Sequence, residues 1–267
     1  MSMLSVQMYT LKKLCAQDYD KALRFCAEAG FDGVEYHCVT PIDKTEFKEL
    51  LEKNGLVLSS SIFDLEIMEK NLDEVMRFNE LCSNRRIVMP YFYAHDEETI
   101  DQCVSRLKPI AKELKNNGFK LYYHNHGHEM KKIKGRYILD ILFDKIGADL
   151  IKLELDCFWA WAGGVDPVAF LLDHRDHVDD VIHIKDGFNL DDCTPLQASC
   201  VPAELKNGLM GGRNVPSALG RGNVPVAEVM KTAKELGIEW LILEDDQAFP
   251  TEMEDVEYSL KLMKLYR

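Results

Sequence analysis

Short runs of apolar residues alternate with longer amphipathic stretches along almost the whole chain. Residues 4–9 place apolar side chains at every second position, which is the period of a β-strand. Residues 19–29 place them at helical spacing instead, and Gly30 follows as a candidate C-terminal cap. The change of period from two to 3.6 recurs about eight times, with short connections.

The complete pattern predicts one strand and one helix in each repeat. Strands are expected at residues 4–9, 33–36, 56–61, 86–90, 119–124, 150–156, 181–185 and 240–244. Helices are expected at residues 19–29, 44–54, 72–81, 97–117, 137–146, 167–172, 226–236 and 253–265. Between the last two strands, residues 186–222 form an irregular stretch rich in Gly, Pro and Asn, which we interpret as a lid or substrate loop.

Regular alternation of strands and helices is typical of an α/β protein with a parallel sheet. We expect a (β/α)₈ TIM barrel that forms one domain over residues 1–267, because barrels commonly occupy this length. An open doubly wound sheet is the alternative. No Gly-x-Gly-x-x-Gly or Gly-x-x-x-x-Gly-Lys motif follows an early strand, so the usual nucleotide-binding markers are missing.

Composition narrows the classes of protein that the chain can represent. Hydrophobic residues make up 46% and charged residues 29%, which is ordinary for a globular protein with a packed core. The net charge of −13 argues against a nucleic-acid partner, which requires a basic surface. We expect a cytoplasmic protein without a membrane partner, because the 8 cysteines are scattered and neither a leader nor a spanning segment is recognisable.

The stretch from Tyr122 to Glu129 carries the densest candidate chemistry. It follows directly on the strand predicted at residues 119–124 and contains three histidines and a carboxylate. Because side chains alternate along a strand, His124 and His126 share one face. The sequence therefore predicts metal ligands or acid–base groups at the end of this strand.

Three later strands also end in ligand-type residues, at Asp156, His183 and Glu244. In a parallel barrel these strand ends converge on one rim, where catalytic residues lie. Together with one ligand from residues 124–129, they predict a metal site of mostly oxygen ligands, best suited to Mn²⁺, with Mg²⁺, Co²⁺, Zn²⁺ or Fe²⁺ as alternatives. Lys185 is in phase with His183, and a buried lysine is rare unless it is paired or functional.

The order of motifs resembles the sugar phosphate isomerase/epimerase family of xylose isomerase-like TIM barrels over nearly the whole length. The resemblance implies a divalent metal held at the ends of strands five to eight, by Asp156, His183, Glu244 and Glu129. In several relatives a Glu occupies the position of His124, so His124 is the alternative fourth ligand. The matching segments are Val6-Gln7-Met8-Tyr9-Thr10-Leu11, Gly30-Phe31-Asp32-Gly33-Val34-Glu35, Tyr123-His124-Asn125-His126, Leu153-Glu154-Leu155-Asp156-Cys157-Phe158-Trp159, Gly163-Gly164-Val165-Asp166-Pro167, His183-Ile184-Lys185-Asp186 and Leu219-Gly220-Arg221-Gly222.

The resemblance also suggests where a substrate would bind. Glu35 and Trp159 belong to matching motifs and are candidate substrate contacts, although Trp159 equally fits simple packing. Arg221 stands where Glu is common in relatives, and it adds a cation that could meet a phosphate or a carboxylate. The third strand ends in serines where many relatives place a His.

The implied activity is isomerisation or epimerisation of a ketose or keto-sugar through an enediolate, with the metal polarising the carbonyl. Candidate acid–base groups are Glu129 or His126 on one side and Glu244 on the other, with His124 an alternative and Lys185 near the developing oxyanion. A lyase or dehydratase acting on a keto-inositol or 3-keto-sugar is the nearest rival. A metal-dependent AP endonuclease and a non-catalytic sugar-binding protein are less favoured, and homo-oligomer formation stays open.

Overall fold

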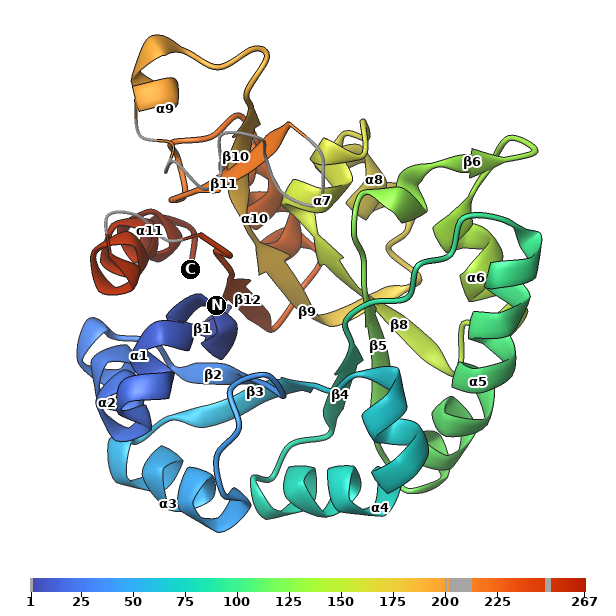
Figure 1. Ribbon diagram of the computed structural model, residues 1–267, viewed down its shortest axis with the longest axis horizontal. Helices are drawn as coiled ribbons and strands as arrows, with labels where there is room; N and C mark the ends of the chain where they lie inside the picture. Colours follow the sequence, from blue (N-terminus) through green and yellow to red (C-terminus); the bar gives the residue numbers. More distant parts are fainter. Residues whose placement is uncertain (1, 200, 202–212, 248–250) are drawn as a thin grey trace.

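Eight parallel strands close into a barrel surrounded by helices in the computed structural model, which describes residues 2–199, 201, 213–247 and 251–267 (Figure 1). The strand order around the barrel is β1-β12-β9-β8-β5-β4-β3-β2, so the first strand pairs with the last. The barrel strands are β1 (Met3–Gln7), β2 (Gly33–His37), β3 (Val57–Ile62), β4 (Arg86–Met89), β5 (Lys120–His124), β8 (Ile151–Asp156), β9 (Val178–Ile184) and β12 (Trp240–Leu243). The predicted TIM barrel is confirmed.

Most predicted helices are present with boundaries within a few residues. Glycines in the left-handed conformation end α2 and α3, at Gly30 (φ 101°) and Gly55 (φ 67°), as capping chemistry requires. The helices are α1 (Lys12–Gln17), α2 (Tyr19–Ala29), α3 (Lys44–Asn54), α4 (Leu65–Leu81), α5 (Glu97–Asn116), α6 (Ile138–Ile146), α7 (Cys157–Ala162), α8 (Pro167–Asp173), α9 (Pro195–Ser199), α10 (Val226–Glu235) and α11 (Glu252–Tyr266).

The sequence predictions differ from the structure where local periodicity is weak. Helix α4 begins at Leu65 rather than Leu72, because a kink at Asn71 divides its apolar stripe in two. Helix α7 was not predicted, because its sequence is apolar on nearly all sides and shows no helical period. The first strand ends at Gln7, two residues earlier than expected, and continues as a 3₁₀ turn, η1 (Met8–Leu11).

Side chains that alternate along the strands divide the interior of the molecule into two cores. The outer faces of the strands pack against the helices in one large apolar cluster that includes Leu121 and Tyr123. The inner faces form a smaller apolar cluster inside the barrel, which includes Tyr122, Trp240 and Ile242. Above this cluster the interior becomes polar toward the carboxyl ends of the strands, and the candidate site lies there.

The stretch after β9 is less irregular than predicted. Strands β10 (Asp186–Asn189) and β11 (Asn214–Ser217) pair antiparallel beside the barrel (Figure 1). Residues 200 and 202–212 of the predicted lid lie outside the described residues. None of the helices in the described part of the chain is long and apolar enough to cross a membrane.

Candidate active site

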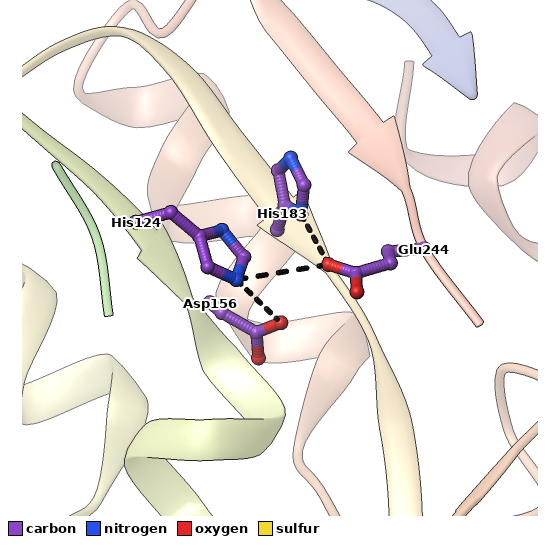
Figure 2. A group of neighbouring side chains, drawn as sticks. All are labelled: His124, Asp156, His183 and Glu244. Atoms are coloured by element: carbon purple, nitrogen blue, oxygen red, sulfur yellow. Dashed lines mark hydrogen bonds and ion pairs between the residues drawn. The ribbon is translucent and has the colours of Figure 1, made fainter. Parts of the chain in front are cut away.

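Four side chains from consecutive barrel segments meet at the carboxyl ends of the strands. His124 ends β5, Asp156 ends β8, His183 lies near the end of β9, and Glu244 follows β12. One ligand atom from each lies within 4.8 Å of the others, and all four side chains are buried. Figure 2 shows His124 pointing toward both carboxylates and His183 pointing toward Glu244.

The two carboxylate oxygens of Asp156 have different surroundings. Its Oδ1 accepts a hydrogen bond of 2.8 Å from the backbone N–H of Trp159 and so caps α7. Its Oδ2 has no hydrogen-bond partner among the described residues and lies 3.8 Å from both His124 Nε2 and Lys185 Nζ. A buried carboxylate oxygen that faces a His ring and lacks a partner has the chemistry of a metal ligand.

His183 bridges two carboxylates. Its Nδ1 donates to Glu244 Oε2 at 2.6 Å, and its Nε2 donates to Glu35 Oε1 at 2.8 Å. Burial opposes the charge on this ring, but Glu154 and Glu35 hold the pKa of His183 well above its usual value. Glu35, a predicted substrate contact, is fully buried and also accepts hydrogen bonds from Ser60 and Gln7.

Lys185 has its ammonium group fully inside the site. Its Nζ donates to Glu244 Oε1 at 2.9 Å and to Asp246 Oδ2 at 2.6 Å. Burial disfavours its charge, yet Asp246 and Glu244 keep the pKa of Lys185 well above its usual value. The same ion pair, together with His183, keeps the pKa of Glu244 well below its usual value despite burial.

Two other buried carboxyl groups, those of Asp156 and Glu154, have raised pKa values. Burial, and then the charge of Glu244, raise the pKa of Asp156 to about 7, although Lys185 acts in the opposite direction. Burial and the charge of Glu35 raise the pKa of Glu154 well above its usual value. Strongly perturbed carboxyl groups in one cluster are typical of sites that bind a cation or carry out catalysis.

Glu129 lies on the other side of the β5 strand end. Its Oε1 accepts a hydrogen bond of 2.7 Å from the Tyr123 hydroxyl, and its Oε2 accepts one of 2.8 Å from the backbone N–H of His126. The structure therefore groups His124, and not Glu129, with Asp156 and the other two ligand atoms. Burial raises the pKa of Glu129 to about 8.

An open cavity of about 360 Å³ lies above these residues. This is within the range of roughly 300–1,000 Å³ that small-molecule sites occupy. His124 and Glu244 reach its floor, while aromatic rings form much of the wall. His126 belongs to this wall, packing 5.1 Å from both Tyr91 and Trp159 between ring centroids.

His126 lines the cavity with an incompletely satisfied ring. Its buried Nδ1 has no hydrogen-bond partner in the described parts of the chain. Burial, and then the charge of Lys185, lower the pKa of His126 to about 3, so the ring is neutral. The structure thus brings His126 and the predicted substrate contact Trp159 to the cavity.

Arg221, the third predicted substrate contact, is placed elsewhere. Its exposed guanidinium lies 4.0 Å from the centroid of the Tyr258 ring, and Arg221 is not among the residues that line the cavity. The neighbouring backbone is fixed by Asp186, whose carboxylate accepts hydrogen bonds from the backbone N–H groups of Gly220 and Gly222.

Several cavity residues were not predicted to be functional. Gln7, Tyr9 and His37 all lie at the cavity, just inside or beyond the ends of β1 and β2. Their position after strands one and two is the signal that could have identified them, because every strand of a barrel ends at the same rim. Asp246 also lines the cavity and accepts a hydrogen bond from Lys185.

Comparison with solved structures shows the same fold in enzymes of related types. A sugar phosphate isomerase/epimerase from Parabacteroides distasonis has 19% identity and a TM-score of 0.76, with 100% of this chain and 96% of that chain covered. The probable 3-DHS dehydratase AsbF from Bacillus anthracis has 15% identity and a TM-score of 0.73, with 99% of each chain covered. D-allulose 3-epimerase from Methylomonas sp. has 13% identity and a TM-score of 0.70, with 100% and 98% covered.

These identities are too low to transfer an activity, so the neighbours support the fold alone. No curated protein matches the sequence significantly. The model of one protein family matches residues 23–266, which is most of the chain. The chain therefore belongs to the family described as the xylose isomerase-like TIM barrel.

Proposed function

We propose that the protein is a divalent-metal-dependent sugar isomerase or epimerase, which acts on a ketose or keto-sugar through an enediolate. The observation that carries the proposal is the group of four buried ligand atoms on His124, Asp156, His183 and Glu244 at the floor of an open cavity. The carboxyl ends of TIM-barrel strands are where such enzymes place their chemistry. We also propose a cytoplasmic location, since the seven described cysteines are free thiols.

The residues present fit a divalent cation. Asp156 Oδ2 is buried without a hydrogen-bond partner among the described residues, and the mixture of carboxylate and imidazole suits Mn²⁺ first, then Mg²⁺, Co²⁺, Zn²⁺ or Fe²⁺. We propose His124, Asp156, His183 and Glu244 as the ligands, with Glu129 as the alternative to His124. A bound cation would supply the electrophile that polarises a substrate carbonyl.

The surrounding side chains have roles that follow from their contacts. Glu35 accepts from His183 Nε2, as do the carboxylates that orient ligand histidines in other metal sites. Lys185 holds Glu244 and Asp246 in place through direct hydrogen bonds. Its position beside the site is consistent with the predicted role near a developing oxyanion.

Proton transfer requires a group that is free to exchange a proton at the cavity surface. His126 lines the cavity with a neutral ring, and we propose it as the group that takes a proton from the carbon next to a substrate carbonyl. Glu129 fixes the backbone of His126 from behind and is a positioning residue in this proposal. Glu244 is the candidate for the opposite side of the substrate.

A dehydratase is the second candidate function. Its support is the fold shared with the probable 3-DHS dehydratase AsbF over 99% of both chains. The same enediolate would then expel a β-hydroxyl group, so the two activities share the metal and the base. Product analysis by NMR distinguishes them, because an epimerase conserves the substrate formula and a dehydratase releases water.

The first experiment measures which residue completes the ligand set. Wild type, His124→Gln and Glu129→Gln are purified with Mn²⁺ and their metal content is determined by elemental mass spectrometry. We expect about one ion per chain in wild type and in Glu129→Gln, and far less than one ion per chain in His124→Gln, because loss of a ligand should weaken binding at least tenfold.

The two variants serve as matched controls, because each replaces one polar side chain at or shortly after the end of β5 with the same residue, Gln. Metal loss in Glu129→Gln with retention in His124→Gln would reverse the assignment. Wild type that binds no divalent ion would contradict the proposed function itself. Deuterium exchange into the carbon next to the carbonyl of a ketose panel then tests proton abstraction directly.

A further inference from the structure

We propose that this site takes an uncharged polyhydroxy ketone and discriminates against its phosphorylated form. The inference rests on the proposed function and specifies its substrate class. It follows from the charge of the cavity wall, from the uncharged polar and aromatic groups of that wall, and from the places where nearby cations are held.

The cavity wall is acidic. Asp64, Glu244 and Asp246 contribute carboxylates to it, and no Lys or Arg lines it among the residues that the structure describes. His37 also lines the cavity, and burial lowers the pKa of His37, so its ring adds no charge at neutral pH. A phosphate monoester carries nearly two negative charges, and proteins usually bind it with Arg, Lys or helix N-termini.

Among the described residues, Lys185 and Lys12 contact residues that line the cavity, and each already donates hydrogen bonds there. Lys185 Nζ is held by Glu244 and Asp246 at 2.9 and 2.6 Å. Lys12 Nζ donates to the backbone carbonyl of Asp246 at 2.8 Å and lies 3.9 Å from the centroid of the Tyr9 ring. Recruiting Lys185 for a phosphate would draw it away from two carboxylates, whereas Lys12 lies outside the residues that line the cavity.

Arg221 also makes its contacts outside the cavity. Its guanidinium packs at 4.0 Å on the Tyr258 ring, a separation typical of a cation–π contact. The backbone on both sides of Arg221 is tied to the carboxylate of Asp186 by the N–H groups of Gly220 and Gly222, at 2.8 and 3.0 Å. The residue that the sequence offers for phosphate recognition is therefore anchored outside the cavity.

Gln7 adds an uncharged amide to the cavity wall. Gln7 is 3% exposed and donates its amide N–H to Glu35, while its Oε1 has no partner among the residues that the structure places. This oxygen is itself buried, so it is not a contact point for a ligand in the cavity. The Gln7 amide is uncharged and therefore contributes nothing that could balance a phosphate dianion.

Aromatic rings complete the wall on two sides. Tyr9 and His37 pack with centroids 5.2 Å apart on one side, and Tyr91 and Trp159 flank His126 on the other. Small-molecule sites commonly combine such apolar surfaces with a few polar groups that fix orientation. These surfaces fit the C–H faces of a sugar and gain nothing from an added phosphate.

The test compares matched pairs of probes on the Mn²⁺-loaded full-length protein. D-fructose is paired with D-fructose 6-phosphate, and D-ribulose with D-ribulose 5-phosphate. Deuterium exchange next to the carbonyl gives kcat/KM for each probe, and calorimetry gives the affinity. We expect the uncharged member of each pair to be favoured by at least tenfold in affinity, and also in kcat/KM where exchange occurs.

Two exposed valines provide matched charge variants. Val39 is 52% exposed and lines the cavity, whereas Val57 is 50% exposed at the amino-terminal start of β3. Val39→Lys is expected to reduce the preference for the uncharged probe about fivefold, the effect of one added charge pair in a water-exposed site. Val39→Gln, without the charge, and Val57→Lys, with the charge at the opposite end, are expected to leave the preference unchanged.

Each outcome decides a separate point. Equal or better exchange with the phosphorylated probes would overturn the inference and leave the proposed function standing. If no probe exchanges deuterium, the proposed function fails, and calorimetry on the same pairs decides the inference alone. Tighter binding of the uncharged probes supports it then, while tighter binding of the phosphates, or no binding by either, overturns it.

Discussion

Glu129 is a single residue whose environment sets a measurable pH dependence. It is fully buried, and the Tyr123 hydroxyl, the His126 backbone and the nearby His128 ring approach its carboxyl oxygens. Burial raises the pKa of Glu129 to about 8, more than its hydrogen bonds lower it. In the unfolded chain the pKa is about 4.3.

Because the folded pKa is the higher one, the folded state holds this proton more strongly. The contribution of Glu129 to stability is fully present below about pH 4.3 and is lost as the pH rises toward 8. We expect the free energy of unfolding of wild type, relative to Glu129→Gln, to fall by about 2 to 3 kcal/mol between pH 5 and pH 7. Urea denaturation of the metal-free proteins at these two pH values measures the difference.

The control is Glu49→Gln, which changes an exposed carboxylate in α3. Its difference from wild type should be the same at both pH values. A constant difference for Glu129→Gln as well would mean that the Glu129 carboxyl ionises normally in the folded protein.

Single residues also show how far the site could be predicted. The alternation of side chains in β5 correctly separates His124, which faces the site, from Tyr123, which packs outside the barrel. Glu129 lies in the short 3₁₀ helix η2 (His128–Met130), where the period of two no longer applies. The sequence therefore leaves open whether His124 or Glu129 is the fourth metal ligand. The metal-ligand role of Glu129 stays a prediction.

At the scale of elements, Asp186 joins the β10–β11 hairpin to the loop that follows it. Its carboxylate accepts hydrogen bonds from the backbone N–H groups of Gly187, Gly220, Gly222 and Val224, at 2.7 to 3.1 Å. A side chain at Gly222 would meet Asp186 Oδ1 at 2.0 Å, so only glycine allows this close approach. One residue thus fixes a turn more than thirty positions away.

Asp186→Asn replaces one acceptor oxygen with an amide that points at backbone donors. We expect amide hydrogen exchange at Gly220, Gly222 and Val224 to accelerate at least tenfold, because unpaired buried donors cost about 1–3 kcal/mol. Exchange in β5 and β8 should stay unchanged. The exposed Asp192→Asn, in the same connection, should show neither effect, and equal acceleration in both variants would contradict the anchoring role.

Elements with clear periodicity or caps were predicted well, and the others were not. Helices α2 and α3 have the predicted bounds because a capping Asp precedes each and a glycine follows. The β10–β11 pairing was missed, because its strands are only four residues long and contain Gly and Pro. Such strands depend on tertiary anchors like Asp186, which local sequence patterns do not reveal.

On the scale of the whole molecule, the two ends of the barrel hold two different polar clusters. The carboxyl ends of the strands hold the candidate site, and the amino-terminal ends hold a different polar cluster centred on Arg86 at the start of β4. Arg86 Nε pairs with Asp180 at 3.1 Å, and its Nη2 pairs with Glu239. Tyr122 and Lys120 also hydrogen-bond to Asp180.

This division explains why the alternating pattern predicted the barrel while leaving the Arg86 cluster unnoticed. Closure of eight strands follows from repeated strand and helix periods, which are a property of the whole chain. Arg86 pairs with Asp180 and Glu239, which lie 94 and 153 positions later in the chain, and this pairing depends on the closure of the barrel. In β4 the sequence showed only a charged residue before an apolar run.

Arg86→Met removes the cation and leaves Asp180 and Glu239 without it. Because Arg86 is only 19% exposed, we expect a loss of about 2 kcal/mol in the free energy of unfolding, less than for a fully buried pair. The affinity for Mn²⁺ should remain unchanged, since the variant leaves the opposite rim intact. Urea denaturation and calorimetric metal titration measure the two quantities independently.

Asp156→Asn is expected to weaken Mn²⁺ binding without lowering stability, which is the opposite of Arg86→Met. The amide oxygen still caps α7 and the penalty for burying a charged Asp156 disappears, which outweighs the lost attraction to Lys185, so stability without metal should be equal to wild type or higher. Binding of Mn²⁺ should weaken at least tenfold, because the unpartnered Oδ2 is a proposed ligand atom. A loss of metal affinity in Arg86→Met, or unchanged affinity in Asp156→Asn, would show that the two ends of the barrel do not act separately.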